Sequence, residues 1–250
     1  MPSSNPLLHS RTRVRARYAL MPLTGFPTSR VPGWTDAEIR ILAAPALGAK
    51  FVQSLITLAP RGGAKLPGDD ACSTFVYQLT GSSVLTIAKE KHPLEEGGFA
   101  LIPPSVAYAI EATTPGKILH LRKRYEPLAG VEVFRPLVGS AQDVKTEPFL
   151  GNEHARLQLL IPDALQYDLA MNVFAFDPGH GLPYVETHVM EHGLYFLSGK
   201  GMYLLEEEWM EAQADDFIYM APYCPQSFYA TGTEPARYIY YKDVNREIDL

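Results

Sequence analysis

Short apolar runs bounded by turn residues recur along the chain, and they predict β-strands. Residues 171–176 are apolar and end at an Asp-Pro-Gly turn, residues 202–205 precede three glutamates, and residues 236–242 alternate between two faces. Weak helical periodicity occurs only at residues 35–42 and 163–167. Evenly spaced short strands with turn signals are typical of a sandwich or barrel, so we expect an all-β fold.

The chain contains an internal repeat. Phe75-Val-Tyr-Gln-Leu-Thr-Gly81 matches Gly193-Leu-Tyr-Phe-Leu-Ser-Gly199, and the two closing glycines stand 118 positions apart. The same offset superposes Phe99 on Phe217 and Pro104 on Pro222. Several matches at one constant offset indicate a tandem duplication. We therefore expect four successive segments: an N-terminal arm at 1–45, a first barrel at 46–127, a connecting segment at 128–165 and a second barrel at 166–250.

The composition is that of a globular protein without a nucleic-acid footprint. Of the 250 residues 46% are apolar, and 22 Lys and Arg against 28 Asp and Glu give a net charge of −6. No run approaches the ~18 apolar residues of a transmembrane helix, and the start lacks the apolar region of a secretory signal. We expect neither a nucleic-acid nor a membrane partner. Two distant cysteines, Cys72 and Cys224, fit a reducing cytosol, so we expect a cytoplasmic protein.

Four arginines stand near the start of the chain: Arg11, Arg13, Arg15 and Arg17. They weakly resemble a transit peptide, but that interpretation needs an amphipathic helix, and this stretch continues into strand-like and Pro-rich sequence. The favoured interpretation is an arm that packs on a neighbouring surface. Such an arm also supports the expectation of a homo-oligomer.

One group of residues has the composition of a functional site, and it lies in the stretch Glu186-Thr-His188-Val-Met-Glu191-His192. Residues of equal parity share a face of an extended segment, so Glu186, His188 and His192 can point one way while Glu191 points away. Two imidazoles and one carboxylate are the composition of an open metal site, and the next hairpin can supply a fourth group near Gln226. The same residues match the zinc-protease pattern H-x-x-E-H. That pattern requires a helix, for which the flanking Gly and Pro residues leave no room.

The chain resembles the cupins, and specifically the two-barrel bicupins. The first cupin motif, G-x5-H-x-H-x3-4-E-x6-G, corresponds to residues 179–199, and the second, G-D-x4-P-x-G-x2-H, to residues 215–226. Glu186, His192 and Gln226 stand where the generic motifs have His, Glu and His. With its flanking sequence, this set resembles the (S)-ureidoglycine aminohydrolase family over nearly the whole chain. The resemblance implies two tandem cupin barrels, each a double-stranded β-helix or jelly roll.

The resemblance also implies an activity, a cofactor and site residues. The expected enzyme is manganese-dependent and hydrolyses (S)-ureidoglycine to (S)-ureidoglycolate and ammonia in purine catabolism. The implied ligands of one Mn²⁺ per chain are Glu186, His188, His192 and Gln226. The implied substrate contacts are Tyr203, Tyr238 and Lys242.

The chemistry of these residues agrees with a small anionic ureido acid as substrate. Two imidazole nitrogens with the oxygens of Glu186 and Gln226 suit Mn²⁺ or Fe²⁺, and Zn²⁺ also remains open. A divalent cation beside one carboxylate keeps a positive charge, and Lys242 adds another. Four protein ligands leave two octahedral positions for a chelating acid. Glu186 is a candidate proton acceptor, while two roles stay open for Lys242: protonating the departing ammonia or clamping the substrate carboxylate.

The first copy lacks a comparable set. At the offset of 118 its corresponding residues are Gly68, Asp70, Thr74 and Tyr108, which do not make a transition-metal site. We therefore expect this barrel to be metal-free and structural, as a packing partner or an oligomer surface.

Two other functions remain open for the second copy. Two His and one carboxylate also form the facial triad of non-haem Fe(II) dioxygenases, and a bicupin can bind a small molecule without catalysis. Oxygen dependence and ammonia release separate these two functions from hydrolysis.

Overall fold

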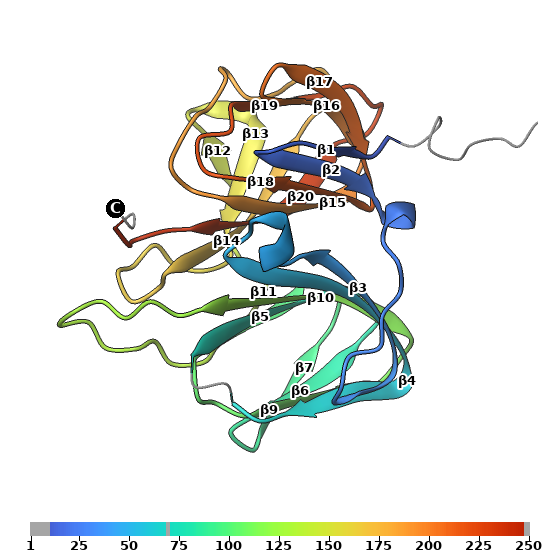
Figure 1. The fold of residues 1–250 in the computed structure, drawn as a ribbon, viewed down its shortest axis with the longest axis vertical. Coiled ribbons are helices and arrows are strands. Elements are labelled where there is room, and N and C mark those ends of the chain that lie inside the picture. Colours follow the sequence, from blue (N-terminus) through green and yellow to red (C-terminus); the bar gives the residue numbers. More distant parts are fainter. Residues whose placement is uncertain (1–10, 69–70, 248–250) are drawn as a thin grey trace, which may run out of the picture. The chain divides into compact units, whose positions relative to one another are not determined.

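The computed structural model describes residues 11–68 and 71–247, which are mostly β-strand (Figure 1). The all-β fold expected from the sequence is therefore confirmed. The chain divides into two compact units, called here the N-terminal and the C-terminal barrel. Within the described residues, no helix is both long and apolar enough to cross a bilayer. The first ten residues of the predicted arm lie outside the described range.

The N-terminal barrel comprises Pro27–Lys145, Gln158–Ala170 and the described part of Asp243–Leu250. Its elements are β3 (Trp34–Ala43), η3 (Pro45–Leu47), β4 (Phe51–Leu66), β5 (Cys72–Thr80), β6 (Ser83–Ile87), β7 (Glu90–Leu94), β8 (Gly98–Ile102), β9 (Tyr108–Ala112), β10 (Gly116–Arg124) and β11 (Leu137–Ser140). The strands lie in the order β11-β8-β5-β10-β4-β9-β6-β7, and β3 pairs with β4. Burial follows the strand period in β6, where Leu85 and Ile87 are buried and Val84 and Thr86 are half-buried.

The C-terminal barrel comprises the described part of Met1–Phe26, Thr146–Leu157 and Met171–Lys242. Its elements are β1 (Arg13–Val14), β2 (Tyr18–Pro22), η2 (Leu23–Gly25), β12 (Glu147–Phe149), β13 (Asn152–Leu159), β14 (Leu169–Phe176), β15 (His192–Ser198), β16 (Lys200–Leu205), β17 (Glu208–Gln213), β18 (Asp216–Met220), β19 (Gln226–Ala230) and β20 (Ala236–Asp243). One sheet has the order β1-β2-β18-β15-β20-β14-β13-β12 and the other β17-β16-β19. Buried aromatic rings, among them Phe176, Phe196 and Phe228, fill its core.

The register of the strands confirms the duplication. β8 and β18 start 118 residues apart, as do β9 and β19. The pairing of Tyr77 with Phe99 recurs at the same offset as Tyr195 with Phe217. Gly81 and Gly199 occupy equivalent turns at φ of 70° and 69°. A Cβ on either glycine would lie within 2.5 Å of a proline carbonyl oxygen, so both turns require glycine.

The predicted arm and the predicted connecting segment do not form separate segments. Each is divided, and its strands belong partly to one barrel and partly to the other. From the predicted arm, β2 pairs with β18 of the C-terminal barrel, whereas β3 pairs with β4 of the N-terminal barrel. From the predicted connecting segment, β11 pairs with β8, whereas β12 and β13 extend the C-terminal sheet. These additions cover strands that would otherwise expose unpaired backbone groups at an edge. A short strand carries no local signal for the sheet it joins.

The helix weakly indicated at residues 35–42 is wrong, because these residues belong to β3. The pairing of β3 with β4 shifts register between Thr35 and Ala37 and again between Ile41 and Ala43. Each shift breaks the alternation of period two, which leaves apolar residues at spacings that resemble a helix. Residues 163–167 also contain no helix, and Tyr167 N–H closes a turn on the carbonyl of Ala164.

The Arg-rich start packs on the C-terminal barrel through ion pairs. Arg11 binds both carboxylate oxygens of Asp216, at 2.5 and 2.9 Å, and the Asp216 side chain is only 2% exposed. Arg15 pairs with Glu208 and Arg17 with Glu206, so the first residue of β17 and a glutamate of the turn before it hold this segment. The arm interpretation is thus correct for the described part of this stretch, and the surface it packs on is β18 and the turn before β17.

We expect Arg11→Gln to lower the free energy of unfolding by about 2 kcal/mol. The substitution leaves the buried Asp216 carboxylate with the backbone N–H of Gln213 as its remaining described donor, and hydrogen bonds to charged groups contribute ~1.5–3 kcal/mol. Urea unfolding measures the loss. Arg13→Gln is the matched control, because its guanidinium donates to the exposed carbonyl of Thr12. An equal loss in both variants would contradict a specific role for the Arg11–Asp216 pair.

Candidate metal centre

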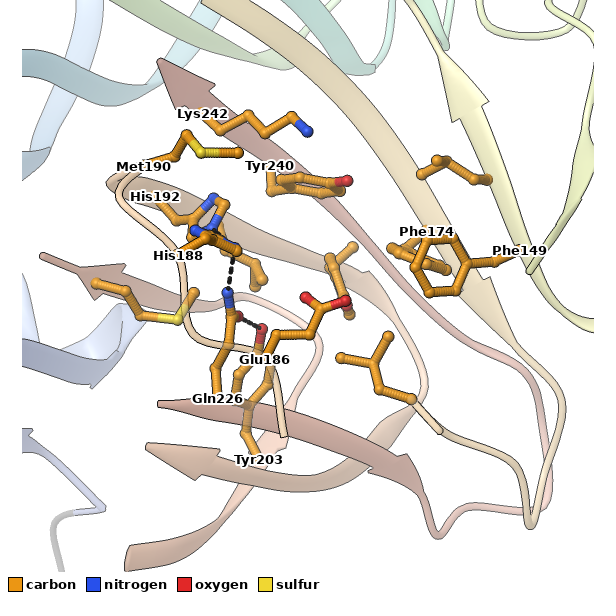
Figure 2. Close-up of a pocket in the computed structure, with 15 residues that line it drawn as sticks. Phe149, Phe174, Glu186, His188, Met190, His192, Tyr203, Gln226, Tyr240 and Lys242 are labelled. Carbon is orange, nitrogen blue, oxygen red and sulfur yellow. Dashed lines mark hydrogen bonds between the residues drawn. The ribbon is translucent and has the colours of Figure 1, made fainter. Parts of the chain in front are cut away.

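A pocket of about 160 Å³ lies in the C-terminal barrel and gathers every residue that the sequence analysis assigned to the site (Figure 2). These lining residues are Glu186, His188, His192, Tyr203, Gln226, Tyr238 and Lys242. They come from the segment before β15 and from β15, β16, β19 and β20. The antiparallel register thus brings together side chains up to 56 positions apart, from residue 186 to residue 242.

The segment that carries Glu186 and His188 is extended and is fixed to β19 by its backbone. Glu186 and Gln226 exchange two backbone hydrogen bonds, of 2.8 and 2.9 Å, and the carbonyl of His188 accepts from the N–H of Tyr223. No helix forms at residues 188–192, which excludes the zinc-protease interpretation because that motif needs both His on one helical face.

The two imidazoles lie close enough to share one cation. Their Nε2 atoms are 3.2 Å apart, and adjacent ligands about 2.1 Å from one metal ion are separated by about 3 Å. His192 Nδ1 lies 3.1 Å from the carbonyl oxygen of Tyr241. This carbonyl accepts a hydrogen bond from Nδ1–H, so the lone pair of Nε2 is available for a cation. Burial, together with the neighbouring His188, lowers the pKa of His192 to about 3, so this imidazole is neutral, as a ligand must be.

Gln226 is the third polar group beside the imidazoles. Its Nε2 lies 3.2 Å from His188 Nε2, while its Oε1 accepts a 2.8 Å hydrogen bond from the Tyr203 hydroxyl. Because a carboxamide is nearly symmetric, the same side-chain position can present its oxygen to a cation and its NH₂ to Tyr203. Tyr203 is buried, which raises the pKa of its hydroxyl well above 10 and keeps it a neutral hydrogen-bonding partner.

Glu186 lines the same pocket, but its carboxylate lies apart from the imidazoles (Figure 2). Consistent with this placement, no cluster of three or more His, Cys, Asp or Glu side chains close enough to hold a metal ion occurs in the described part of the chain. Burial raises the pKa of Glu186, and the positive charge of Lys242 opposes this shift. The structure therefore gathers His188, His192 and Gln226, with the Glu186 carboxylate in the same pocket at a distance from them.

β20 supplies one wall of the pocket through alternate residues. Tyr238, Tyr240 and Lys242 all line it, as their shared parity predicts. Lys242 is the register partner of His192, and Figure 2 shows its side chain beside Tyr240. The Tyr240 hydroxyl accepts a 3.1 Å hydrogen bond from Asn172, and its ring packs edge-on against His192. The lysine thus sits beside the imidazoles on a strand that neighbouring contacts hold in place.

Several lining residues were missed by the sequence analysis. They are apolar or aromatic: Phe149, Leu157, Phe174, Leu182, Met190, Leu194, Met220 and Tyr240. Phe149 and Leu157 belong to β12 and β13, in the segment interpreted as a connection, so no local signal placed them at the pocket. This apolar wall excludes water from one side of the polar cluster, which strengthens electrostatic interactions inside it.

The donor set fits a divalent cation of the Mn²⁺, Fe²⁺ or Zn²⁺ type. Two imidazole nitrogens, one amide oxygen and one carboxylate within a single pocket are ligands that these ions accept, and no cysteine is among the lining residues described. Such a site also requires a neutral imidazole and a hydrogen-bond acceptor that orients it. His192 meets both requirements, because it is neutral and bonds to the carbonyl of Tyr241.

Comparisons with known proteins decide the family. A model of the cupin domain matches residues 172–241. The (S)-ureidoglycine aminohydrolase of Escherichia coli (strain K12) is 32% identical to this chain over 98% of its length and 95% of the relative. This chain belongs to the (S)-ureidoglycine aminohydrolase family. A solved structure of protein Ylba from E. coli matches 99% of both chains with 31% identity and a TM-score of 0.88.

A more distant likeness supports the fold alone. An oxalate decarboxylase from Bacillus subtilis matches 92% of this chain and 78% of its own with 13% identity and a TM-score of 0.70. The two tandem cupin barrels expected from the sequence are thereby confirmed. Membership of the (S)-ureidoglycine aminohydrolase family makes the chain an enzyme that hydrolyses a carbon–nitrogen bond.

Proposed function

We propose that this enzyme hydrolyses (S)-ureidoglycine to (S)-ureidoglycolate and ammonia, as a step of purine catabolism, with one Mn²⁺ held in the C-terminal barrel. The observation that carries the proposal is the single pocket lined by all seven predicted site residues. Fe²⁺ and Zn²⁺ are the alternative cations, because the same donors suit them.

The charges of the pocket support a small carboxylate as substrate. The proposed holders of the cation are His188, His192, Gln226 and Glu186. When bound, Mn²⁺ would supply a Lewis acid for the substrate. Lys242 adds a positive charge beside the imidazoles, on the opposite side of the cluster from Tyr203 (Figure 2). A pocket of about 160 Å³ restricts the substrate to a small acid, which agrees with ureidoglycine.

The reaction breaks one bond and forms another at the substrate α-carbon. The bond to the amino nitrogen breaks, a bond to a water oxygen forms, and the nitrogen leaves as ammonia. In this proposal Glu186 accepts a proton from the water, and the burial that raises the pKa of its carboxyl supports a role as base. Tyr203 holds Gln226 in position, and Lys242 binds the substrate carboxylate or protonates the leaving nitrogen.

Ammonia release with defined metals tests the proposal. Protein stripped with a chelator and reloaded with Mn²⁺, Fe²⁺ or Zn²⁺ is supplied with ureidoglycine, and ammonia is measured above the uncatalysed rate with and without oxygen. We expect Mn²⁺ to give the fastest release, oxygen to have no effect, and (S)-ureidoglycolate to be the product. Turnover that stops without oxygen would favour the dioxygenase, and binding without ammonia release would favour a binding protein.

We expect Lys242→Met to retain the metal and to lower kcat by about 10²–10³-fold, the usual contribution of a positioned acid or charge. Methionine keeps the length of the side chain and removes its charge. Metal content by elemental analysis and steady-state ammonia release are the measurements. Lys200→Met, on an exposed position of β16, is the matched control and should keep full activity. Activity within twofold of the parent in Lys242→Met would remove Lys242 from the mechanism.

A further inference from the structure

Three tyrosines line the pocket of the C-terminal barrel, and their hydroxyls differ in what they bind. They are Tyr203, Tyr238 and Tyr240. Tyr203 donates to Gln226 Oε1 at 2.8 Å, and the Tyr238 hydroxyl interacts with that of Tyr203. These two hydroxyls therefore form one group with the proposed ligand Gln226. The Tyr240 hydroxyl stands outside this group and has a separate partner, which is not a lining residue.

The partner of Tyr240 is Asn172, a residue of β14 that is 1% exposed. Asn172 Nδ2 donates a 3.1 Å hydrogen bond to the Tyr240 hydroxyl oxygen, and this hydroxyl makes no other hydrogen bond within the described residues. A hydroxyl both accepts and donates. Because the Tyr240 oxygen already accepts from Asn172, its own proton remains for a second partner, and the pocket is where such a partner can bind.

The other end of the Asn172 amide carries a cost in stability. Its Oδ1 is buried and has no hydrogen-bond partner in the described part of the chain. An unpartnered buried carbonyl destabilises the folded state, and a leucine of similar shape would avoid this cost. A buried polar group of this kind calls for an explanation, and holding the Tyr240 hydroxyl in a fixed direction supplies one.

The ring of Tyr240 is held by contacts with other pocket residues. It packs edge-on against His192 with centroids 5.7 Å apart, and it lies nearly parallel to the ring of Phe174 at 6.2 Å. Figure 2 shows its hydroxyl end turned away from the imidazoles, toward Phe174 and Phe149. The hydroxyl thus reaches the aromatic side of the pocket, which the two imidazoles do not.

A ureido acid has a group that suits this side of the pocket. In the proposed function the metal ion and Lys242 take the carboxylate end of the substrate, which leaves the planar and uncharged ureido group. Its carbonyl oxygen is a hydrogen-bond acceptor, and a neutral O–H group is a matching donor.

We propose that the Tyr240 hydroxyl donates a hydrogen bond to the ureido carbonyl of the substrate, and that Asn172 is the positioning residue for this hydroxyl. The inference rests on the proposed function, because it takes a ureido acid as the ligand. Tyr240 thereby selects ureido acids over simple hydroxy acids, since an acid without the ureido group leaves the hydroxyl unpaired.

Calorimetric titration of the Mn²⁺-loaded enzyme with two acids tests the contact. The probes are (S)-ureidoglycolate and glycolate, which share the carboxylate and the α-hydroxyl and differ by the ureido group. We expect the parent to bind (S)-ureidoglycolate at least about tenfold more tightly. Tyr240→Phe should weaken (S)-ureidoglycolate about tenfold and leave glycolate within about twofold of the parent. Tyr229→Phe, at an exposed tyrosine of β19, is the matched control and should bind both acids as the parent does.

Asn172→Leu separates a positioning role from a packing role. We expect it to weaken (S)-ureidoglycolate about threefold, because the hydroxyl loses its fixed direction, and to add no further loss in the Tyr240→Phe background. Its urea midpoint should be no lower than the parent's, since the substitution removes the unpartnered oxygen. A lower midpoint, or a loss of affinity that adds fully to that of Tyr240→Phe, would assign Asn172 to packing and overturn its positioning role.

Failure of the contact and failure of the proposed hydrolysis give different results. Ammonia release by the parent with unchanged (S)-ureidoglycolate binding in Tyr240→Phe overturns the contact and keeps the hydrolysis, and a hydroxyl that donates to Asn172 Oδ1 gives this result. Selective loss of (S)-ureidoglycolate in Tyr240→Phe without ammonia release by the parent keeps the contact and removes the hydrolysis. Equal weakening of both acids, or a parent that does not prefer (S)-ureidoglycolate, also overturns the contact. If Asn172→Leu fails to fold, Tyr240→Phe decides.

Discussion

The His188→Ala variant should lose nearly all bound metal and at least about 10³-fold of the ammonia-release rate. Its Nε2 lies 3.2 Å from His192 Nε2 and from Gln226 Nε2, so His188 is the centre of the polar cluster. Without it, the remaining imidazole and amide form an incomplete ligand set, and a bound cation contributes several kcal/mol to catalysis. Elemental analysis and ammonia release after reloading with Mn²⁺ measure both losses. The two should fall together.

A matched histidine provides the control. His180 precedes the same segment, but its ring stacks on His154 with centroids 4.0 Å apart and is not among the pocket-lining residues. We expect His180→Ala to keep its metal and its rate. Both variants should give the circular dichroism spectrum of the parent, because both residues lie on a short irregular segment between strands. Full manganese occupancy in His188→Ala would refute the proposed ligand set, whatever its activity.

The candidate site residues could be named from the sequence partly by local rules and partly by the family resemblance, which alone implied Tyr203, Tyr238 and Lys242. Glu186 and His188 share parity on an extended segment, and Tyr238 and Lys242 share parity on one strand. All four line the pocket. The direction of a side chain beyond its Cβ has no such rule. The sequence therefore could not predict that the Glu186 carboxylate lies away from the imidazoles, which only the structure shows (Figure 2).

Features that depend on pairing between strands far apart in the sequence could not be predicted from the sequence. The duplication predicted equivalent strands in the two barrels, and β8 and β18, like β9 and β19, do start 118 residues apart. It could not place β2, β3 or β12, which have no counterpart that reveals their partners. For this reason the sequence did not predict that Phe149, on β12, lines the pocket. Two register shifts between β3 and β4 interrupt the alternation of buried and exposed residues that identifies a strand.

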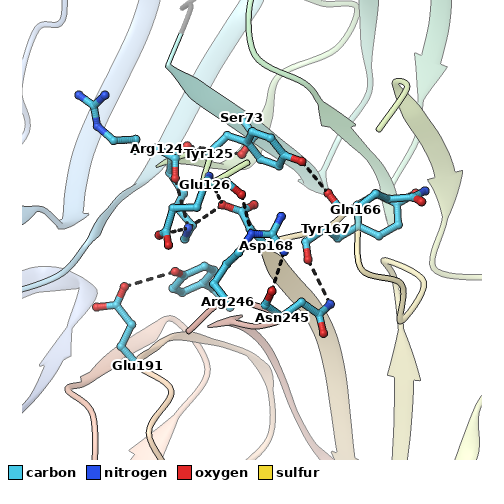
Figure 3. A network of polar contacts seen from close by, with 12 residues as sticks. Ser73, Arg124, Tyr125, Glu126, Gln166, Tyr167, Asp168, Glu191, Asn245 and Arg246 are labelled. Carbon is cyan, nitrogen blue, oxygen red and sulfur yellow. Dashed lines mark hydrogen bonds and ion pairs between the residues drawn. The ribbon is translucent and has the colours of Figure 1, made fainter. Parts of the chain in front are cut away.

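A buried ion pair is the clearest example of such a long-range contact, and breaking it should have the largest effect on stability. Lys123 Nζ lies 2.6 Å from Asp168 Oδ2, and the two side chains are 2% and 0% exposed. Asp168 also accepts from the backbone N–H of Glu126, and Figure 3 shows it among Tyr125, Glu126 and Arg246. Burial lowers the pKa of Lys123, but the Asp168 and Glu126 carboxylates together raise it more, so the net pKa lies above 10.5. The pair's contribution is therefore complete at neutral pH and is lost only as the pH rises through that higher pKa.

We expect Lys123→Met to lower the free energy of unfolding by about 3–5 kcal/mol, because it leaves a carboxylate buried with one backbone donor. Trp34 fluorescence in the Trp209→Phe background follows urea unfolding of this barrel. Lys123→Met combined with Asp168→Asn should recover at least half of the loss, since the uncompensated charge is then removed while the amide oxygen still accepts from Glu126 N–H. Glu126→Gln, at the 45% exposed partner of Lys123, should cost under about 1 kcal/mol. Losses that simply add in the double variant would show that the two side chains are not coupled, and the stability of this barrel would then rest on its apolar core.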